Sequence, residues 1–386
     1  MDTIFVVGEI VLAGLVFIFN LLGISSAVSA SFALSFIVLV AYIAFSGVAR
    51  RVNATLFVII VVSTINVILN GASYSAATLN FDYFKKLIFF ITSIVYFELA
   101  TRVEVHDKAK IIVKYIIYFL GIFLVIDYFV LGNHKMLGRY LTMGFTNPNF
   151  TAMWLLQLFL FYIYYIAASK AKIEKILCIS VSVLCLYLIT LTLNRAALFI
   201  LPIYILLAVL GMVRKKYQLN KHFIFVVLLV PIFVYVFYHL IISNQHINQM
   251  FNFIVSEGKG LDSRSRVWDF ATSKLFAGGW LIGDYAGISD GTGASQMHNT
   301  HLDILISYGI LPFTLFLKLL YSICRRVNDT NETFIQYLAY IGFMLMLLFG
   351  TFEAGLFAGC TGLNYLTGTL IVLARNREEK VLWKEE

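Results

Sequence analysis

The chain has 386 residues, of which 60% are hydrophobic and only 13% are charged. Soluble globular domains carry about 25% charged residues, so this composition excludes a soluble globule and indicates a polytopic membrane protein. The formal net charge is +8, but the sequence contains no soluble basic and aromatic module that would read bases. We therefore expect no nucleic-acid partner and attribute the basic excess to membrane topology and anionic lipid.

Apolar runs follow one another along nearly the whole chain. A membrane-spanning helix needs about 20 apolar residues, so each run of about that length is a predicted span. In chain order the predicted spans are 4–20, 24–46, 55–70, 87–100, 111–131, 149–168, 176–193, 196–213, 223–243, 302–322, 334–352 and 355–374. The prediction is an all-α fold with about twelve transmembrane helices. It forms a single transmembrane domain over 1–386, with a large loop at 244–301 between helices nine and ten.

The basic residues indicate which connections face which side. Clusters of Lys and Arg mark cytoplasmic loops, and most of the 29 basic residues fall in every second connection and in the C-terminal tail. Both termini are therefore expected in the cytoplasm, and the loop 244–301 outside. The basic residues expected on the outer face are Lys85, Lys86, Lys135, Arg139, Arg195, Lys259, Arg264, Arg266 and Lys274. Cations gathered at one rim of the membrane indicate an anionic ligand at that level.

Metal- and nucleotide-driven chemistry is disfavoured by the motifs. The sequence has no HExxH motif, no acidic cluster with divalent-metal spacing and no P-loop. Its cysteines have neither metal-site spacing nor a disulfide pattern, so packing is the better interpretation; they are Cys178, Cys185, Cys324 and Cys360. We expect neither a metal nor a cofactor.

Two short outward segments carry polar residues. The first has Arg139 and then Asn147-Pro148-Asn149, where asparagine can cap a helix that begins at proline; taken alone, this pattern indicates only a helix start. The second, Thr190–Ala197, places Arg195 between two apolar runs. The arginine could snorkel to the interface. Because a charge at so short a turn is costly and usually functional, we favour a functional role.

The loop 244–301 is the third outward segment. Within it, Arg264 and Trp268 are four residues apart and share a face if the segment is helical, whereas Arg266 points elsewhere. His298 lies just before an apolar span, close to the membrane surface. A lone histidine is more often a hydrogen-bonding surface residue than a base, but nearby arginines favour a functional role here.

Four motifs in these segments occur in a fixed order on the expected outer side. They are Gly144–Ala152 with Asn147-Pro148-Asn149, Thr192–Ala197, Arg264-Ser-Arg-Val-Trp268, and the segment from His298-Asn299 to Gly309. In combination they resemble the signature of the O-antigen ligase and polysaccharide polymerase superfamily, in which an arginine precedes a tryptophan by four and a His-Asn pair precedes a glycine by eleven. The chain departs from that signature at Asn194-Arg195-Ala196, where the family has Ser-Arg-Gly. It departs again at His301, where an aromatic residue is usual, and around Ala277, where a common proline is missing.

The resemblance implies a metal-independent, inverting glycosyltransferase of the polytopic GT-C type. Such an enzyme works on the outer face of the cytoplasmic (inner) membrane. Its donor and acceptor are polyprenyl-pyrophosphate-linked oligosaccharides, and membrane lipid, a chain-length regulator and a flippase are the further partners implied.

The chemistry of such a reaction indicates roles for individual residues. Arg195 and Arg264 are expected to stabilise the departing pyrophosphate, with Arg266 and Arg139 contributing less. His298 is the expected base, because an imidazole has an unperturbed pKa of about 6.5, and His301 is its rival. Glu353 is expected to orient a partner, contact sugar or cap a helix. The other residues expected to contact substrate are Trp268, Asn299 and Asn147.

Three functions remain open at this point. We favour polymerisation of lipid-linked repeat units, because the chain is compact and its His-Asn-x-x-Leu pattern looks closer to that branch. A ligase would pass the glycan to another outer acceptor, such as lipid A–core. A flippase or polysaccharide transporter would place charges in a cavity along the spans, whereas these spans are nearly free of Lys and Arg.

Overall fold

The chain is an all-α membrane protein, and the part of it that the structure describes contains one small β-hairpin. The computed structural model describes residues 2–45, 53–73, 81–103, 105, 107–145, 147–243, 262–283, 297–353, 355–358 and 361–375. Some helical side chains lie outside the described residues, those of Arg264 and Arg266 among them. The helices up to the large loop are α1 (Asp2–Leu21), α2 (Ser25–Phe45), α3 (Ala54–Ser73), α4 (Phe81–Ala100), α5 (Asp107–Phe129), α6 (Pro148–Ala168), α7 (Lys172–Thr192), α8 (Arg195–Arg214) and α9 (Lys221–Ser243). Beyond it come α11 (Asp262–Lys274), a π-helical turn (Leu275–Gly279), α12 (Trp280–Ile282), α13 (Thr300–Tyr308), α14 (Ile310–Asp329), α15 (Phe334–Phe349), α16 (Gly355–Ala358) and α17 (Thr361–Arg375).

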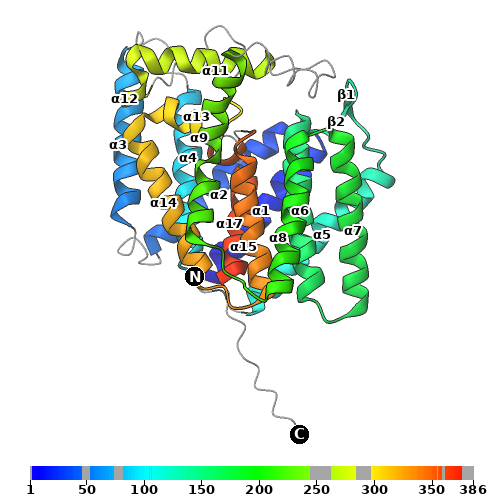
Figure 1. Ribbon diagram of the computed structural model, residues 1–386. Coiled ribbons are helices and arrows are strands. Elements are labelled where there is room, and N and C mark those ends of the chain that lie inside the picture. Colours follow the sequence, from blue (N-terminus) through cyan, green and yellow to red (C-terminus); the bar gives the residue numbers. More distant parts are fainter. Residues whose placement is uncertain are drawn as a thin grey trace.

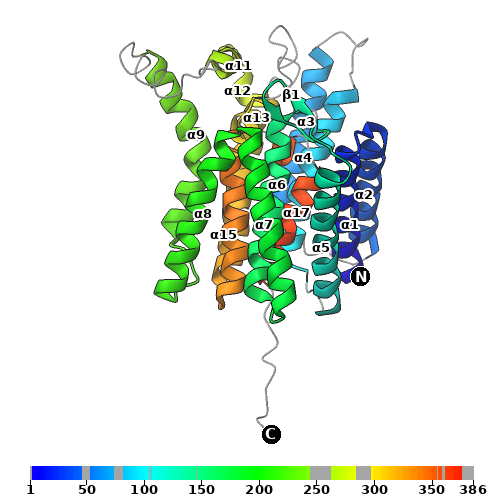
Figure 2. The same cartoon turned by 90° about the vertical axis from the view of Figure 1, so that its right-hand side faces the viewer.

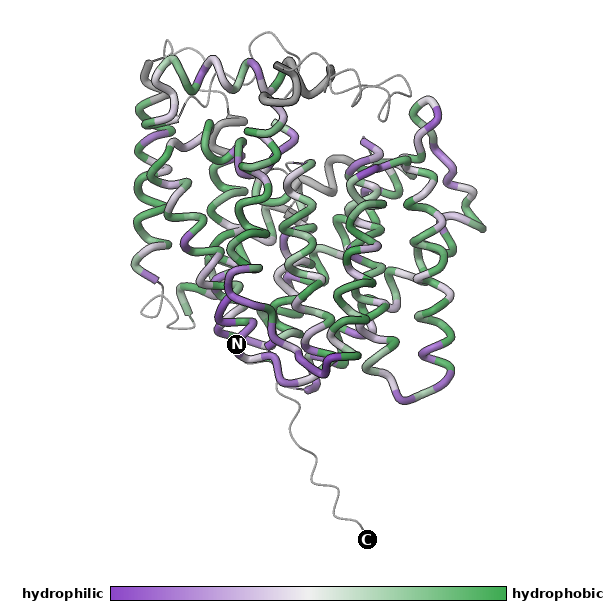
Figure 3. The backbone as a smooth tube through the Cα atoms, viewed as in Figure 1, coloured by the Kyte–Doolittle hydropathy of each residue, from purple (hydrophilic) through white to green (hydrophobic). Residues whose placement is uncertain are grey.

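Most helices run side by side in a bundle with an apolar belt (Figures 1 and 3). Within the described residues, six are long and apolar enough to cross a membrane, namely α1, α5, α6, α7, α8 and α9. Shorter apolar helices fall on the runs in α2, α3 and α15. The twelve predicted spans therefore stay a prediction, although helices lie on every predicted run.

Different elements lie at the two ends of the bundle. The helix α1 begins at one end of the bundle, the end marked N in Figure 1. The hairpin of β1 (Met136–Leu137) and β2 (Tyr140–Leu141) and the helix α11 lie at the opposite end (Figures 1 and 2). The outward segments predicted from the sequence therefore share one end. That this end faces outside the cell stays a prediction of the positive-inside rule.

Two of the predicted spans are broken helices. The run 302–322 divides at Gly309 into α13 and α14, and the run 355–374 divides into α16 and α17. Gly309 has φ +84, and a Cβ there would lie 2.3 Å from the carbonyl oxygen of Leu281. Only glycine tolerates that conformation and that approach. The break makes α13 a short helix that ends against α12.

The helix α11 lies across the end of the bundle (Figure 1), so the segment around Trp268 is helical. Trp268 is 2% exposed, and its ring packs edge-on against Tyr238 at 4.6 Å between centroids. Its indole Nε1 donates to the carbonyl oxygen of Met297 at 2.7 Å. Trp268 thus fixes α11 to the residue that precedes His298.

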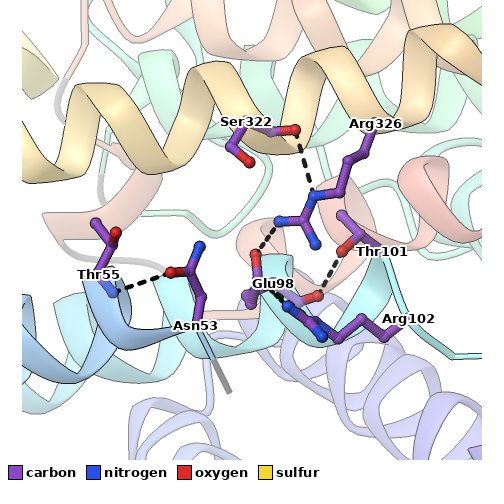
Figure 4. A network of polar contacts seen from close by, with 7 residues as sticks. All are labelled: Asn53, Thr55, Glu98, Thr101, Arg102, Ser322 and Arg326. Carbon is purple, nitrogen blue, oxygen red and sulfur yellow. Dashed lines mark hydrogen bonds and ion pairs between the residues drawn. The ribbon is translucent and has the colours of Figure 1, made fainter. Parts of the chain in front are cut away.

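The helix α4 is tied to the α13–α14 pair by ion pairs at two levels. Lys86 meets Asp303 at 2.9 Å, with side chains 13% and 2% exposed. At the other end of α4, the buried Glu98 accepts from Arg102 of its own helix at 2.6 Å and from Arg326 of α14 (Figure 4). A carboxylate with two guanidinium partners satisfies the requirement that a buried charge be paired. These contacts hold α13 in place, and α13 begins at the candidate site.

Candidate functional site

His298 sits in a fixed turn at the start of α13. Its φ is +50, a left-handed conformation that few non-glycine residues adopt. Asn299 caps the helix by accepting from the amides of His301 and Leu302, each at 3.1 Å. The amide group of Asn299 also donates to the carbonyl oxygen of Pro231 at 2.8 Å, and the residue is fully buried. Asn299 therefore positions His298 and has no surface with which to contact substrate.

Glu353 lies in the turn after α15 and reaches His298. The carboxylate Oε2 lies 3.0 Å from His298 Nδ1, with the two side chains 3% and 31% exposed. Thr300 holds the same turn, because its Oγ1 donates to the carbonyl oxygen of Glu353 at 3.1 Å and its amide to that of Gly350 at 2.8 Å. Of the three roles expected for Glu353, the geometry supports the orientation of a partner.

Two asparagines extend the contact into a chain of side chains. Asn149 Nδ2 donates to Glu353 Oε1, and Asn194 Nδ2 donates to Asn149 Oδ1 at 2.7 Å. Asn147 caps α6 by accepting from the amide of Asn149 at 2.9 Å. The chain runs His298–Glu353–Asn149–Asn194, and we name these residues the polar chain. It joins the starts of α6, α8 and α13 with the end of α15.

The arginines expected at the site differ in where they lie relative to the polar chain. Arg195 directly follows Asn194, begins α8 and is exposed. Arg139 is exposed in the β-hairpin, with its guanidinium 5.5 Å from the centroid of the Tyr140 ring. The backbones of Arg264 and Arg266 belong to α11, but their side chains lie outside the described residues. Arg195 is thus the cation that the described structure joins to the polar chain through its neighbour.

His301 and Trp268 have other surroundings than expected. The ring of His301 is buried, 3% exposed, and lies edge-on to Phe313 and Phe316 at 6.1 and 5.9 Å between centroids. A ring enclosed by aromatic side chains cannot receive a proton from a bulky substrate, so His301 is not a rival to His298 in this structure. Trp268 is equally buried and anchors α11, so the expectation of a substrate contact is replaced by a positioning role.

Two members of the site could not be predicted directly from the sequence. Asn149 and Asn194 were expected only as parts of a helix start and a turn, and they prove to link Glu353 to the residue before Arg195. For Asn194 the signal was an asparagine at a helix N-cap, since capping uses the Oδ1 atom and leaves the amide group available. Asn149 follows the α6 cap, Asn147, by two residues and is not itself a cap. Partners far apart in sequence cannot be read from a local pattern.

The arrangement is suited to proton transfer. If the carboxylate of Glu353 accepts from His298 Nδ1, the other ring nitrogen, Nε2, is left as an acceptor. A histidine so oriented is the usual general base for a hydroxyl. Among the described residues, no group of three or more His, Cys, Asp or Glu side chains is placed to hold a metal ion.

Comparison with protein-family models, with curated proteins and with solved structures finds no match to this chain. The resemblance to the O-antigen ligase and polymerase superfamily therefore rests on the four motifs alone.

Proposed function

We propose that this protein is a glycosyltransferase that polymerises polyprenyl-pyrophosphate-linked oligosaccharides on the outer face of the cytoplasmic membrane. Further parts of the proposal are the twelve-span topology and the GT-C type. The observation that carries it is the polar chain, because it gives a partly exposed histidine a buried carboxylate partner at the end of the bundle that holds all four motifs.

The proposed reaction is an inverting transfer. His298 Nε2 takes the proton of the acceptor sugar hydroxyl as its oxygen attacks the anomeric carbon of the donor. The bond from that carbon to the pyrophosphate oxygen breaks, and polyprenyl pyrophosphate leaves with the electron pair. Glu353 stabilises the imidazolium that forms, because a carboxylate at Nδ1 favours the charged ring.

Negative charge develops on the departing pyrophosphate, and arginine side chains stabilise it best in a setting poor in water. Arg195 is suited to this role, because it is exposed and begins α8 directly beside Asn194. The free amides and positive end of α8 add to its effect. Arg264 is the second cation in the proposal, carried by α11 across the same end of the bundle.

The test uses purified full-length protein in detergent or nanodiscs with a lipid-linked repeat unit, and product length is followed by gel electrophoresis or mass spectrometry. The expected result for the native protein is a ladder of polymers. For His298→Ala, turnover should fall by about 10²-fold or more. His134→Ala is a matched control, since His134 is exposed on the hairpin side of the bundle, and it should retain activity.

Two outcomes contradict the proposal. Transfer of a single glycan to a different acceptor, without any ladder, would indicate a ligase. Polymerisation by His298→Ala at a native rate would remove the proposed base.

A further inference from the structure

An exposed apolar segment follows α11 at the edge of the bundle (Figure 1). It covers the π-helical turn and α12, and its exposed large side chains are Phe276, Trp280, Leu281 and Ile282, which we name the α12 patch. These side chains are 87%, 47%, 53% and 44% exposed. A single exposed apolar side chain needs no explanation, but four of them within seven consecutive residues form a surface that is unfavourable in water.

The helix before the patch exposes polar side chains instead. Among the described side chains of α11, the exposed ones are Asp269 and Ser273, which lie one helical turn apart. The chain then kinks at Gly278, where φ is +100 and a Cβ would have no neighbour within 4 Å. Glycine is therefore needed at this position for its conformation. The kink separates a helix suited to water from an end that is not.

Two glycines fix the level of the α12 patch along the bundle. A Cβ at Gly309 would collide with the carbonyl oxygen of Leu281, and a Cβ at Gly283 would lie 2.6 Å from that of Ser307. The main chain of α12 thus lies directly against the junction of α13 and α14. From this junction α14 continues for 20 residues, with Arg326 in its last turn, and such a helix is about 30 Å long, enough to cross the hydrocarbon core. Leu281 therefore lies at the level where the predicted span of α14 meets the membrane boundary.

The patch is also continuous with apolar surface on the neighbouring helices. Leu311, in the first turn of α14, is 49% exposed, and α12 packs on this helix. On its other side α14 packs against α3, which exposes Ile65, Ile68 and Leu69. Lipid acyl chains are the partner that covers the exposed apolar side chains of spanning helices. The same lipid would reach the α12 patch, and tryptophan is enriched at the boundary between acyl chains and headgroups.

We propose that the α12 patch inserts into the lipid leaflet at this end of the bundle, with Trp280 at the level of the headgroups. By the positive-inside rule this is the outer leaflet. The helix α11 is then held at two places, by Trp268 against Tyr238 of α9 and by lipid beyond Gly278. The inference is independent of the proposed glycosyltransferase activity.

Spin labels measure the depth of the patch in the full-length protein in phosphatidylcholine nanodiscs. The native cysteines are replaced by alanine, and a nitroxide is attached at Phe276→Cys or Leu281→Cys. Ser273→Cys is the matched control from the polar side of the kink, and Leu311→Cys is the reference for lipid. Oxygen dissolves in acyl chains, whereas a polar nickel complex stays in water. Collisions with oxygen should exceed those with nickel at Phe276, Leu281 and Leu311, and the order should be reversed at Ser273.

Two results of this experiment would overturn the insertion. Nickel collisions in excess at Phe276 and Leu281, as at Ser273, would place the patch in water. Protection of both labels from both reagents would show that protein covers the patch, and the mass of the particle would then tell whether that protein is a second copy of the chain.

Trp280 gives a second test that leaves the native cysteines in place. The fluorescence lost in Trp280→Phe is that of Trp280 alone, and an exposed tryptophan can be replaced by phenylalanine without loss of the fold. Phosphatidylcholine brominated near the headgroup should quench this component more strongly than phosphatidylcholine brominated near the chain ends, because Trp280 is expected at the interface. Quenching by neither lipid would show that Trp280 lies outside the bilayer, and the proposal would be wrong.

Discussion

The exchange of Glu353 for glutamine tests whether the polar chain controls the histidine. The substitution Glu353→Gln keeps the size of a side chain that is 3% exposed and changes only its charge and one oxygen. Asn149 Nδ2 donates toward this side chain, so the remaining oxygen of glutamine must face Asn149. The amide group of glutamine is then directed at His298 Nδ1, which has to accept a hydrogen bond where it donated one.

The cost follows from that reversal. With Nδ1 as acceptor, the ring proton moves to Nε2, and the histidine loses its basic nitrogen toward substrate. Restoring the reactive tautomer breaks the neutral hydrogen bond from the glutamine amide, about 0.5–1.5 kcal/mol, and leaves two donors facing each other in a buried place, about 1–3 kcal/mol more. Since about 1.36 kcal/mol corresponds to tenfold in rate, kcat should fall by about 10- to 10³-fold.

The assay measures kcat and donor binding separately for folded, purified protein. Glu353→Gln should bind lipid-linked donor with nearly native affinity, and the double variant His298→Ala/Glu353→Gln should be no slower than His298→Ala, because the two residues act as one unit. Glu353→Asp keeps the charge and should be less damaging. A kcat for Glu353→Gln within about threefold of the native value would refute the reasoning, as would fully additive losses.

Three further outcomes follow from the fold. Gly309→Ala should lower the free energy of unfolding, measured by detergent titration, by more than about 3 kcal/mol. Gly342→Ala is the control and should be tolerated, because a Cβ at Gly342 meets Leu370 at an ordinary 3.5 Å. Equal effects of the two substitutions would contradict the close approach at Gly309. Lys86→Met should cost about 3–5 kcal/mol by leaving Asp303 buried and unpaired, and Lys86→Met/Asp303→Leu should recover most of that loss; a double variant as unstable as the single one would contradict the pairing. In a chain freed of its native cysteines, an impermeant maleimide should label Met136→Cys in intact cells and Lys172→Cys only after lysis, both positions being exposed, and the opposite result would invert the topology.

The helices could be predicted from the sequence because the bilayer imposes a length on apolar runs. Most predicted runs coincide with helices within a few residues, as α6 (Pro148–Ala168) does with the run 149–168, whereas α4 begins six residues before the run 87–100 and α14 ends seven residues after the run 302–322. The breaks were not predicted, since Gly309 lies inside a run that is apolar on both sides. Its role depends on the carbonyl of Leu281, a contact between segments that no local pattern contains.

The site, like the helices, was predicted only in part, because contacts between distant segments do not appear in a local pattern. His298 and Glu353 were both expected at the outer rim, and the structure joins them, although 55 residues separate them in the chain. The burial of His301 and Asn299 could not be foreseen, because it depends on α9 and α14, which approach from other parts of the sequence. Polarity in a sequence shows that a residue needs partners, and only the fold shows which partners it has.

Three of the four motifs have the same feature, an asparagine that caps a helix. This feature combines the structural and the functional interpretation, which were alternatives in the sequence analysis. Asn147, Asn194 and Asn299 each cap a helix that starts at the same end of the bundle, with Oδ1 accepting from the backbone. The amide groups of Asn194 and Asn299 then donate to a second partner, Asn149 in one case and Pro231 in the other. A serine cap would satisfy the helix equally well, but serine has no separate amide group that could donate to a second partner. Asparagine at these starts therefore stabilises the helix and places its neighbour, Arg195 or His298, in one step. Three helix starts directed at one region also bring three positive dipole ends together, and these would stabilise the pyrophosphate leaving group of the proposed reaction.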